Sequence, residues 1–163
     1  MERDPGCRQP QPETDDDFPY DVLEEDLCCA VVTDVPVLIS AAPEVAEGIA
    51  HRIHRYGPFR DLRFTVIDCD GAEREVGGVL SEALVGGEGR GGYPGTVLLK
   101  NVGGLSPALQ DRLCGHLPGG SVRILSSSRE SLLDMVKLGL FDDNLFYRLN
   151  LIHIVVEDEP ALR

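Results

Sequence analysis

The residues between Val37 and Tyr56 have the order of a strand, a loop and a helix that other proteins use to hold a nucleotide phosphate. A phosphate-binding loop needs glycines, so that successive backbone N–H groups converge on the anion, and a lysine that reaches the outer phosphates. The loop here contains neither residue type. It reads Ser40-Ala41-Ala42-Pro43-Glu44-Val45-Ala46-Glu47. The sequence therefore predicts the shape of a phosphate site without the groups that hold the phosphate.

Other polar residues are expected at the carboxyl ends of neighbouring strands, where parallel sheets bind their ligands. These strand ends are Ser40, Asp68, Lys100 and Ser126. Lys100 has the charge to pair with a phosphate, and a salt bridge to an acidic neighbour is the alternative. Because Asp68 and Asp70 stand at the adjacent strand end, the sequence favours a salt bridge between Lys100 and one of these two residues.

Two pairs of potential metal ligands lack the neighbours that a metal site needs. His51 and His54 are three residues apart on one predicted helix, with no carboxylate or cysteine at ligand spacing, so a solvated or capping role is favoured. Cys28 and Cys29 have no nearby histidine, and we interpret them as two small apolar residues near the start of the fold. With five cysteines and no Cys-x-x-Cys pair, the sequence is typical of a reduced cytosolic protein without a metal site.

Short apolar runs alternate with helical periodicity from Val35 onward. The runs predict strands at 37–39, 64–68, 97–99, 122–125 and 151–156, and the periodicity predicts helices at 43–56, 73–85, 107–117 and 129–138. Continuous apolar runs are typical of strands buried on both faces, and strand–helix alternation gives right-handed crossovers. We therefore expect an α/β fold with three layers around a parallel five-stranded sheet. The glycine-rich stretch 85–92 is interpreted as a connector, because no strand precedes it and no lysine and helix follow it.

Charge divides the chain into two parts. Residues 1–34 contain eleven acidic residues and two arginines, within a chain of net charge −13, and we expect them to form an acidic, largely flexible N-terminal tail. Within this part, the apolar residues between Tyr20 and Val32 allow a short helix that docks on the core. Residues 35–163 form the predicted α/β domain.

Composition excludes several classes of function. The acidic surface repels nucleic-acid phosphates, and no basic stripe offsets it, so direct nucleic-acid binding is not expected. No apolar stretch is long enough to span a bilayer, and the first residues lack the pattern of a secretion signal. We therefore expect a cytoplasmic protein without membrane contact.

Three further stretches carry a family resemblance. They are Ile53-His54-Arg55 at the end of the first predicted helix, Gly95–Leu99 followed by Leu109–Leu113, and Gly139–Asn150, which contains the string Leu-Phe-Tyr-Arg-Leu-Asn. Through these stretches the chain, from Val37 to about Val156, resembles the AAA+ ATPase domain of bacterial enhancer-binding proteins, the sigma-54-interaction family. The resemblance implies a P-loop NTPase or AAA+-like core, here without the helical lid that would begin where the printed sequence stops.

Compared with that family, the positions that handle ATP are changed. The resemblance implies that Ala46 occupies the position of the phosphate-loop lysine. Lys100 and Asn101 stand where the family has an aspartate that holds Mg²⁺ and a glutamate that polarises water, yet lysine does not bind Mg²⁺ and asparagine does not take a proton. Ser128 stands at a phosphate-sensing position. With no nucleotide to sense, the serines at 126–128 are expected to satisfy loop backbone groups.

The residues that family members use between subunits are also changed. Family members have two arginines that reach the ATP of a neighbouring subunit. Asp142 occupies the position of the first arginine, and Arg148 is retained at the position of the second. We expect Arg148 to pack on Tyr147 or to pair with an acid of its own subunit, which leaves it only a possible subunit contact. The family's loop that touches the sigma factor has no counterpart between Cys69 and Gly95.

Together these features predict a non-hydrolysing module without a catalytic residue, a cofactor or a metal, which acts in transcription regulation through a protein partner. The partner expected from the resemblance is a sigma-54 activator or another part of the transcription machinery. Two alternatives stay open: an ATP-binding regulator with an atypical site, which would need ATP and Mg²⁺, and a relic without a selected function.

Overall fold

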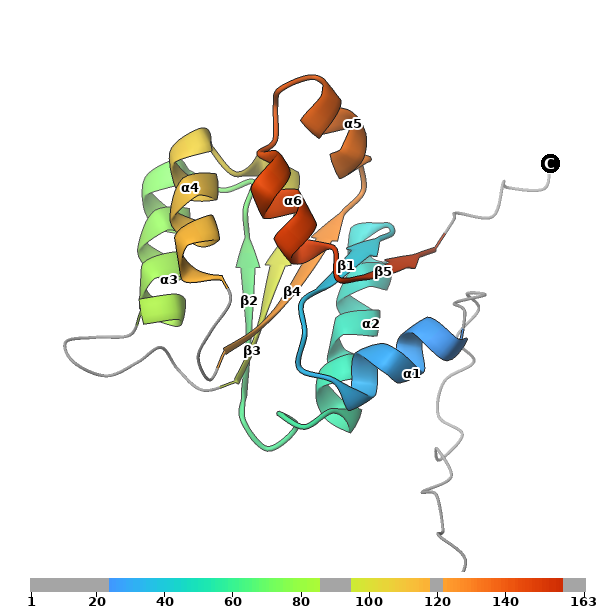
Figure 1. Ribbon diagram of the computed structural model, residues 1–163. Coiled ribbons are helices and arrows are strands. Elements are labelled where there is room, and N and C mark those ends of the chain that lie inside the picture. Colours follow the sequence, from blue (N-terminus) through green and yellow to red (C-terminus); the bar gives the residue numbers. More distant parts are fainter. Residues whose placement is uncertain (1–23, 86–94, 118–121, 157–163) are drawn as a thin grey trace, which may run out of the picture.

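The computed structural model describes residues 24–85, 95–117 and 122–156, which form one sheet with helices on both sides (Figure 1). The strands are β1 (Val37–Ser40), β2 (Arg63–Asp68), β3 (Gly95–Lys100), β4 (Val122–Ser128) and β5 (Ile152–Val155). The helices are α1 (Glu24–Val32), α2 (Pro43–Tyr56), α3 (Glu73–Val85), α4 (Pro107–His116), α5 (Leu132–Lys137) and α6 (Asp143–Leu149), with a 3₁₀ turn, η1 (Val102–Gly104). The predicted glycine-rich connector lies, after Val85, outside the described residues.

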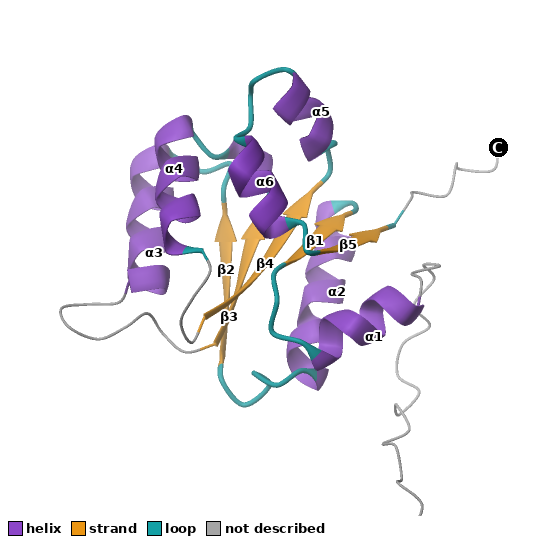
Figure 2. Cartoon of the chain, viewed as in Figure 1, coloured by secondary structure: helices purple, strands orange, loops and turns teal. Residues whose placement is uncertain are grey.

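The sheet has the strand order β2-β3-β4-β1-β5, and each pair of neighbouring strands is parallel. Helices connect the strands because a parallel pair needs a crossover rather than a hairpin. Figure 2 shows the sheet between its two helical layers. The prediction of a three-layer α/β fold around a parallel five-stranded sheet is confirmed, and the five predicted strands occur within a few residues of their predicted ends.

The two faces of the sheet support separate hydrophobic cores. Leu38 of β1 belongs to the core beneath α3, α4, α5 and α6, whereas its neighbours Val37 and Ile39 belong to the core beneath α1 and α2. Successive side chains of a strand point to opposite faces, so a strand covered on both sides is apolar at every position. This is why Val37-Leu38-Ile39 reads as an unbroken apolar run, and why the β1–α2 junction is held in place by packing.

Helix α1 packs on the domain and is not part of an extended tail. Ala30 is fully buried, in the same core as α2, and its carbonyl oxygen accepts a hydrogen bond from Nη2 of Arg123 on β4. The short docking helix expected between Tyr20 and Val32 is thus present. Residues 24–32 belong to the packed body of the domain, whereas residues 1–23 lie outside the described part of the chain and their tail character stays a prediction.

The region after β4 differs from the prediction of one helix at 129–138. Helix α5 starts later because Ser131 caps it, its Oγ accepting the Asp134 N–H at 3.3 Å, and Gly139 ends the turn with a φ of 73°. A second helix, α6, was not predicted. It forms where Asp142 acts as the N-cap, with Oδ1 accepting the Leu145 N–H at 2.9 Å.

Candidate functional site

The junction between β1 and α2 is a two-residue turn. Only Ala41 and Ala42 separate the strand from the helix, which begins at Pro43, and Ala42 offers no side-chain cap. The Ala41 N–H donates to the Ser128 carbonyl oxygen at 3.3 Å, and the Ala46 N–H donates to Ala42 at 2.9 Å inside the helix. Because proline has no N–H, this turn does not present a run of converging backbone donors to an anion.

The side chain at the predicted lysine position contributes packing only. Ala46 is fully buried in the core beneath α2, together with Ile49 and Ile53. A longer, charged side chain has no room there without displacing these neighbours. The helix therefore supplies no cation towards the carboxyl edge of the sheet from this position.

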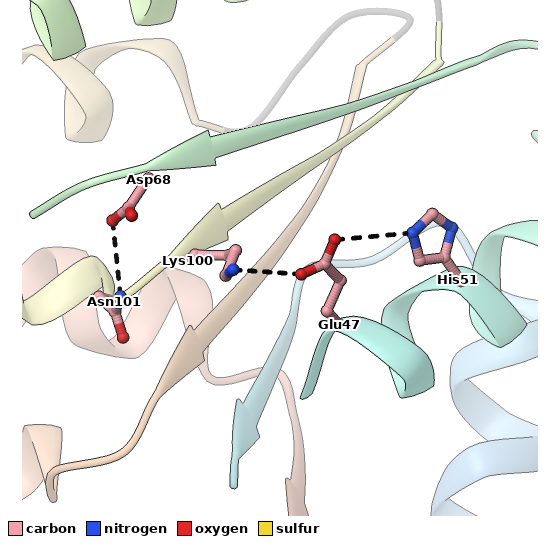
Figure 3. Close-up of polar contacts among 5 residues, drawn as sticks. All are labelled: Glu47, His51, Asp68, Lys100 and Asn101. Carbon is pink, nitrogen blue, oxygen red and sulfur yellow. Dashed lines mark hydrogen bonds and ion pairs between the residues drawn. The ribbon is translucent and has the colours of Figure 1, made fainter. Parts of the chain in front are cut away.

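The cation at this edge comes from the strand, and it pairs with the helix (Figure 3). Lys100 Nζ donates to Glu47 Oε2 at 3.1 Å, and Glu47 Oε1 lies 3.9 Å from Nε2 of His51, one turn further along α2. The side chains of Lys100 and Glu47 are 23% and 36% exposed, so the pair is partly in solvent. This ion pair links the end of β3 to the first turns of α2.

The predicted salt bridge between Lys100 and Asp68 or Asp70 is wrong. Lys100 and Asp68 are neighbours in the strand register, yet the long lysine side chain extends toward α2 (Figure 3). Oδ1 of Asp68 instead accepts the Asp70 N–H at 3.0 Å and faces the Asn101 amide at 3.5 Å. The aspartate is engaged in closing its own turn, and Glu47 is the acid that the lysine reaches.

Asn101 has a conformational role at its position. It adopts the left-handed conformation, with a φ of 55°, where β3 turns into η1. Asparagine tolerates this region better than most residues. Its amide Nδ2 points to Asp68, so the structure uses the side chain to hold the turn, and an amide has no basic site for a proton.

The serines at the end of β4 are buried. Ser128 Oγ donates to the Glu130 carbonyl oxygen at 2.7 Å, which confirms the expected backbone role for this residue. Ser126 departs from that expectation, because its buried Oγ has no hydrogen-bond partner among the described residues. A hollow of about 270 Å³ opens beside Ser128, lined also by Asp70, Asn101, Gly103, Gly104, Arg129 and Glu130.

Arg148 binds backbone carbonyl groups, whereas the sequence analysis expected it to pack on Tyr147 or to pair with an acid. Its Nη1 donates to the carbonyl oxygens of Cys114, at 3.2 Å, and Leu117. These carbonyls lie at the C-terminal end of α4, where helix carbonyls lack intrahelical donors and a positive charge is favourable. Arg148 therefore joins α6 to α4. Its contact to a second subunit stays a prediction.

The histidine and cysteine pairs do not converge on a shared site. His54 Nδ1 is hydrogen-bonded to Thr96 Oγ1 at 2.8 Å, and burial lowers the pKa of His54. Cys28 and Cys29 are exposed free thiols on α1, the first helix of the described chain. Within the described ranges, no three His, Cys, Asp or Glu side chains are grouped so that they could hold a metal.

One contact at the site was missed by the sequence analysis. Ser40 Oγ lies 2.7 Å from Nε2 of His153 on β5, and burial lowers the pKa of this histidine. The register pairs His153 with Leu38, which lies two residues before Ser40 on β1. Residues two apart on a strand share a face of the sheet, so His153 and Ser40 lie on the same face. Only the adjacency of β1 and β5, which the sequence does not specify, could have revealed it.

The chain is similar in sequence to several transcription regulators. No family model matches the chain. It is 29% identical to the HTH-type transcriptional regulatory protein TyrR of Citrobacter braakii over 149 residues, covering 78% of this chain and 28% of that protein. It is 30% identical to the DNA-binding transcriptional regulator NtrC of a Bradyrhizobium strain over 156 residues, covering 80% of this chain and 32% of that protein.

A solved structure shows the same fold. The P-loop NTPase domain of the sigma-54 transport activator from E. coli superposes with a TM-score of 0.64 at 17% identity, covering 83% of this chain and 92% of that one. The parallel sheet and the strand–turn–helix at its centre thus define an α/β domain of the P-loop NTPase, AAA+ class. The chain belongs to the AAA+ domain family of sigma-54-dependent transcription regulators.

The match concerns one part of those regulators. The chain spans less than a third of the length of the TyrR and NtrC proteins that it matches. Among the described helices, none has the length and apolar character needed to cross a membrane.

Proposed function

We propose that this chain is a non-hydrolysing AAA+-like module that acts in transcription regulation through contacts with a protein partner. The observation that carries the proposal is the ion pair between Lys100 of β3 and Glu47 of α2, with its 3.1 Å contact. In a working phosphate site the helix side supplies the cation and the strand end supplies the acids. Here the signs are exchanged, so a triphosphate would meet Glu44 and Glu47 at the start of the helix.

Hydrolysis needs groups that these positions do not supply. Phosphoryl transfer depends on a metal, a lysine, a water-positioning residue and an arginine, and loss of a single such arginine costs about 10³–10⁵ in rate. The side-chain amide of Asn101 contacts Asp68 at the turn after β3. Asp142 caps α6 at a position where the resemblance implies an arginine. We therefore assign no catalytic residue, no cofactor and no metal to the degenerate site formed by Ser40–Glu47, Lys100, Asn101 and Ser128.

Kinship with sigma-54-dependent regulators supports the choice of partner. A domain that has kept the fold but exchanged the charges of its nucleotide site is expected to act through its surface. The proposed partner is a sigma-54 activator or another component of the transcription machinery, met in the cytoplasm. The acidic character of the chain, with a net charge of −13, would steer this encounter electrostatically.

A second candidate is an ATP-binding regulator with an atypical site. It is favoured by the uncapped start of α2, since Ala42 leaves the first-turn N–H groups without a side-chain acceptor. A helix start of this kind attracts anions. Pro43 and Glu44 oppose that attraction, by removing a donor and by adding a negative charge.

Thermal unfolding with and without Mg-ATP distinguishes the two candidates. A ligand at one hundred times its Kd stabilises a protein by about 2.7 kcal/mol, which is easily seen as a rise in Tm. We expect no rise at millimolar Mg-ATP, with a nucleotide-binding domain of a family member as the positive control. A concentration-dependent rise, matched by heat released in a calorimetric titration, would overturn the proposal in favour of the second candidate.

A further inference from the structure

A local reversal of charge begins at His51, one helical turn after Glu47, and extends to the end of the domain opposite the Lys100–Glu47 pair. The segment 51–63 joins the C-terminal half of α2 to the start of β2, at the lower end of the view in Figure 1. It contains four arginines and two histidines against one acid: Arg52, Arg55, Arg60, Arg63, His51, His54 and Asp61. In a chain of net charge −13 this segment stands out, although it is too short to read as a basic stripe.

Packing fixes the shape of this segment. The ring of Phe64 lies 4.2 Å from that of His51 and 5.1 Å from that of His54, which ties the start of β2 to α2. Between them the chain turns tightly, with the Arg60 N–H donating to Gly57 and the Leu62 N–H donating to Phe59. The charged side chains are therefore presented on a compact, preorganised turn.

Pro58 and Asp61 are exposed on this turn together with five further residues, Arg55, Tyr56, Arg60, Leu62 and Arg63, and we call these five the basic surface. The Arg55 guanidinium lies over the Tyr56 ring at 5.7 Å. Arg60 Nε is 3.8 Å from Asp61, but these side chains are 64% and 92% exposed, so the pair is weak and leaves most guanidinium donors in solvent. The mixture of exposed arginines, one tyrosine and one leucine suits an acidic peptide that carries apolar or aromatic residues.

We propose that the basic surface binds the acidic N-terminal segment of the same chain, residues 1–23. This segment contains seven acidic residues and two arginines, and its run Asp15-Asp16-Asp17 is followed at once by Phe18 and, after Pro19, by Tyr20. Acidic and aromatic residues thus stand next to one another in the segment, as Arg55 and Tyr56 do on the surface. The complementarity covers both charge and side-chain type.

The position of α1 allows the N-terminal segment to reach the basic surface. The C-terminal end of α1 lies beside the turn, since the Val31 carbonyl oxygen would be 3.2 Å from a Cβ placed on Gly57. A helix of nine residues is about 14 Å long. The seven residues from Asp17 to Leu23 span up to about 23 Å when extended, so the acidic run can return along α1 to the basic surface.

Tethering favours this occupant over others. A covalently linked peptide has an effective concentration in the millimolar range when its linker spans the distance. Free nucleic acid, the other polyanion that such a surface could attract, is repelled at longer range by the net negative charge. The inference is independent of the proposed function, because it involves no residue of the nucleotide-site positions.

A spin label on the native Cys7 tests the contact in the full chain. The exposed Cys28 and Cys29 and the half-buried Cys114 are replaced by serine, whereas Cys69 is buried and its pKa is raised to about 12 by burial and by Asp68 and Asp70, so it does not compete for the label. In ¹⁵N spectra we expect the label to lower the amide intensities of residues 55–63 at least twofold relative to the reduced label. Residues 40–47, at the far edge of the sheet, should keep their intensities.

Two variants and one mixing experiment decide the result. D15N/D16N/D17N and 0.5 M NaCl should both restore the intensities, whereas the matched control E75Q/D111N/D143N, at exposed positions of the folded domain, should not. Unchanged intensities at residues 55–63 in the labelled chain, or equal losses on all faces, would overturn the proposal. Equal losses in a mixture of ¹⁵N-labelled chain and unlabelled spin-labelled chain would also overturn it, because the occupant would then be a second copy.

Discussion

The two edges of the sheet differ in how far their polar side chains are buried and paired. At the carboxyl edge, Lys100, Glu47 and Asn101 have partners on neighbouring elements and remain partly in solvent. At the amino edge, Arg123 is 1% exposed and its guanidinium donates to the Ala30 carbonyl oxygen, while its Nε and Nη1 have no partner within the described residues. The edge at which this fold binds ligands is thus the one whose charges are already matched to one another.

This difference in burial affects how much each polar contact contributes to stability. A partly exposed ion pair contributes little to stability because water competes for both charges. A buried guanidinium has lost its water, so each remaining hydrogen bond matters more, and burial lowers the pKa of Arg123 accordingly while Asp34 opposes the shift. Rigidity at the amino edge therefore depends on Arg123 and α1, whereas at the carboxyl edge Lys100 and Glu47 are paired with each other.

The largest expected effect tests the amino edge. Arg123→Ala should lower the free energy of unfolding by about 3 kcal/mol, because it removes a fully buried side chain and the hydrogen bond that holds the end of α1. Urea unfolding followed by circular dichroism measures this loss. The control Arg123→Met keeps most of the volume without the charge and should cost less than half as much. A loss below about 1 kcal/mol for the alanine variant would remove the contrast between the edges.

A smaller effect is expected at the carboxyl edge. In a double-mutant cycle of Glu47→Gln and Lys100→Met, the coupling energy should be about 0.5 kcal/mol and should shrink further in 1 M NaCl. Urea unfolding of the four variants gives this number. A coupling energy above about 2 kcal/mol would mean that the pair behaves as a buried one. The polar contacts of the carboxyl edge would then contribute as much to stability as those of the amino edge.

The smallest effect comes from His54, which lies near Arg123 and bonds to Thr96. Burial is the main reason that its folded-state pKa lies below the ordinary value of 6.5. The neutral imidazole is therefore the form that the fold favours, so its contribution to stability is complete above about pH 6.5 and is lost as the pH falls through the folded-state pKa. An NMR titration of the His54 ring should give a midpoint below 6.5, and a midpoint above 6.5 would contradict the assignment.

Much of the fold was accessible to prediction. Buried parallel strands can be predicted from apolar runs, as at Val37–Ile39. Helix α2 has both helical periodicity of its apolar residues and a proline at its start. Helix α6 was missed because seven residues hold too little periodicity, and its start depends on the cap at Asp142. That cap is itself placed by Gln110, whose Oε1 accepts the Asp142 N–H at 2.9 Å from another helix.

The candidate site was predicted in composition but not in its contacts. The sequence identified the loop, Lys100, Asn101 and Ser128 as the relevant positions, yet it paired Lys100 with the wrong acid. Lys100 and Glu47 are 53 residues apart, and only the packing of α2 against the sheet brings them together. Arg148 was likewise assigned to side chains, whereas the end of α4 supplies its acceptors.

The amino-acid sequence alone determined the alternation of strands and helices, and it also determined that the β1–α2 turn has neither glycine nor lysine. Both are local properties, written in the order of side chains and in the backbone freedom that each residue allows. The tertiary structure decided which charges meet: Lys100 with Glu47, and Arg123 with the end of α1. Such pairs depend on how helices cross the sheet, and this geometry arises from the packing of the whole core.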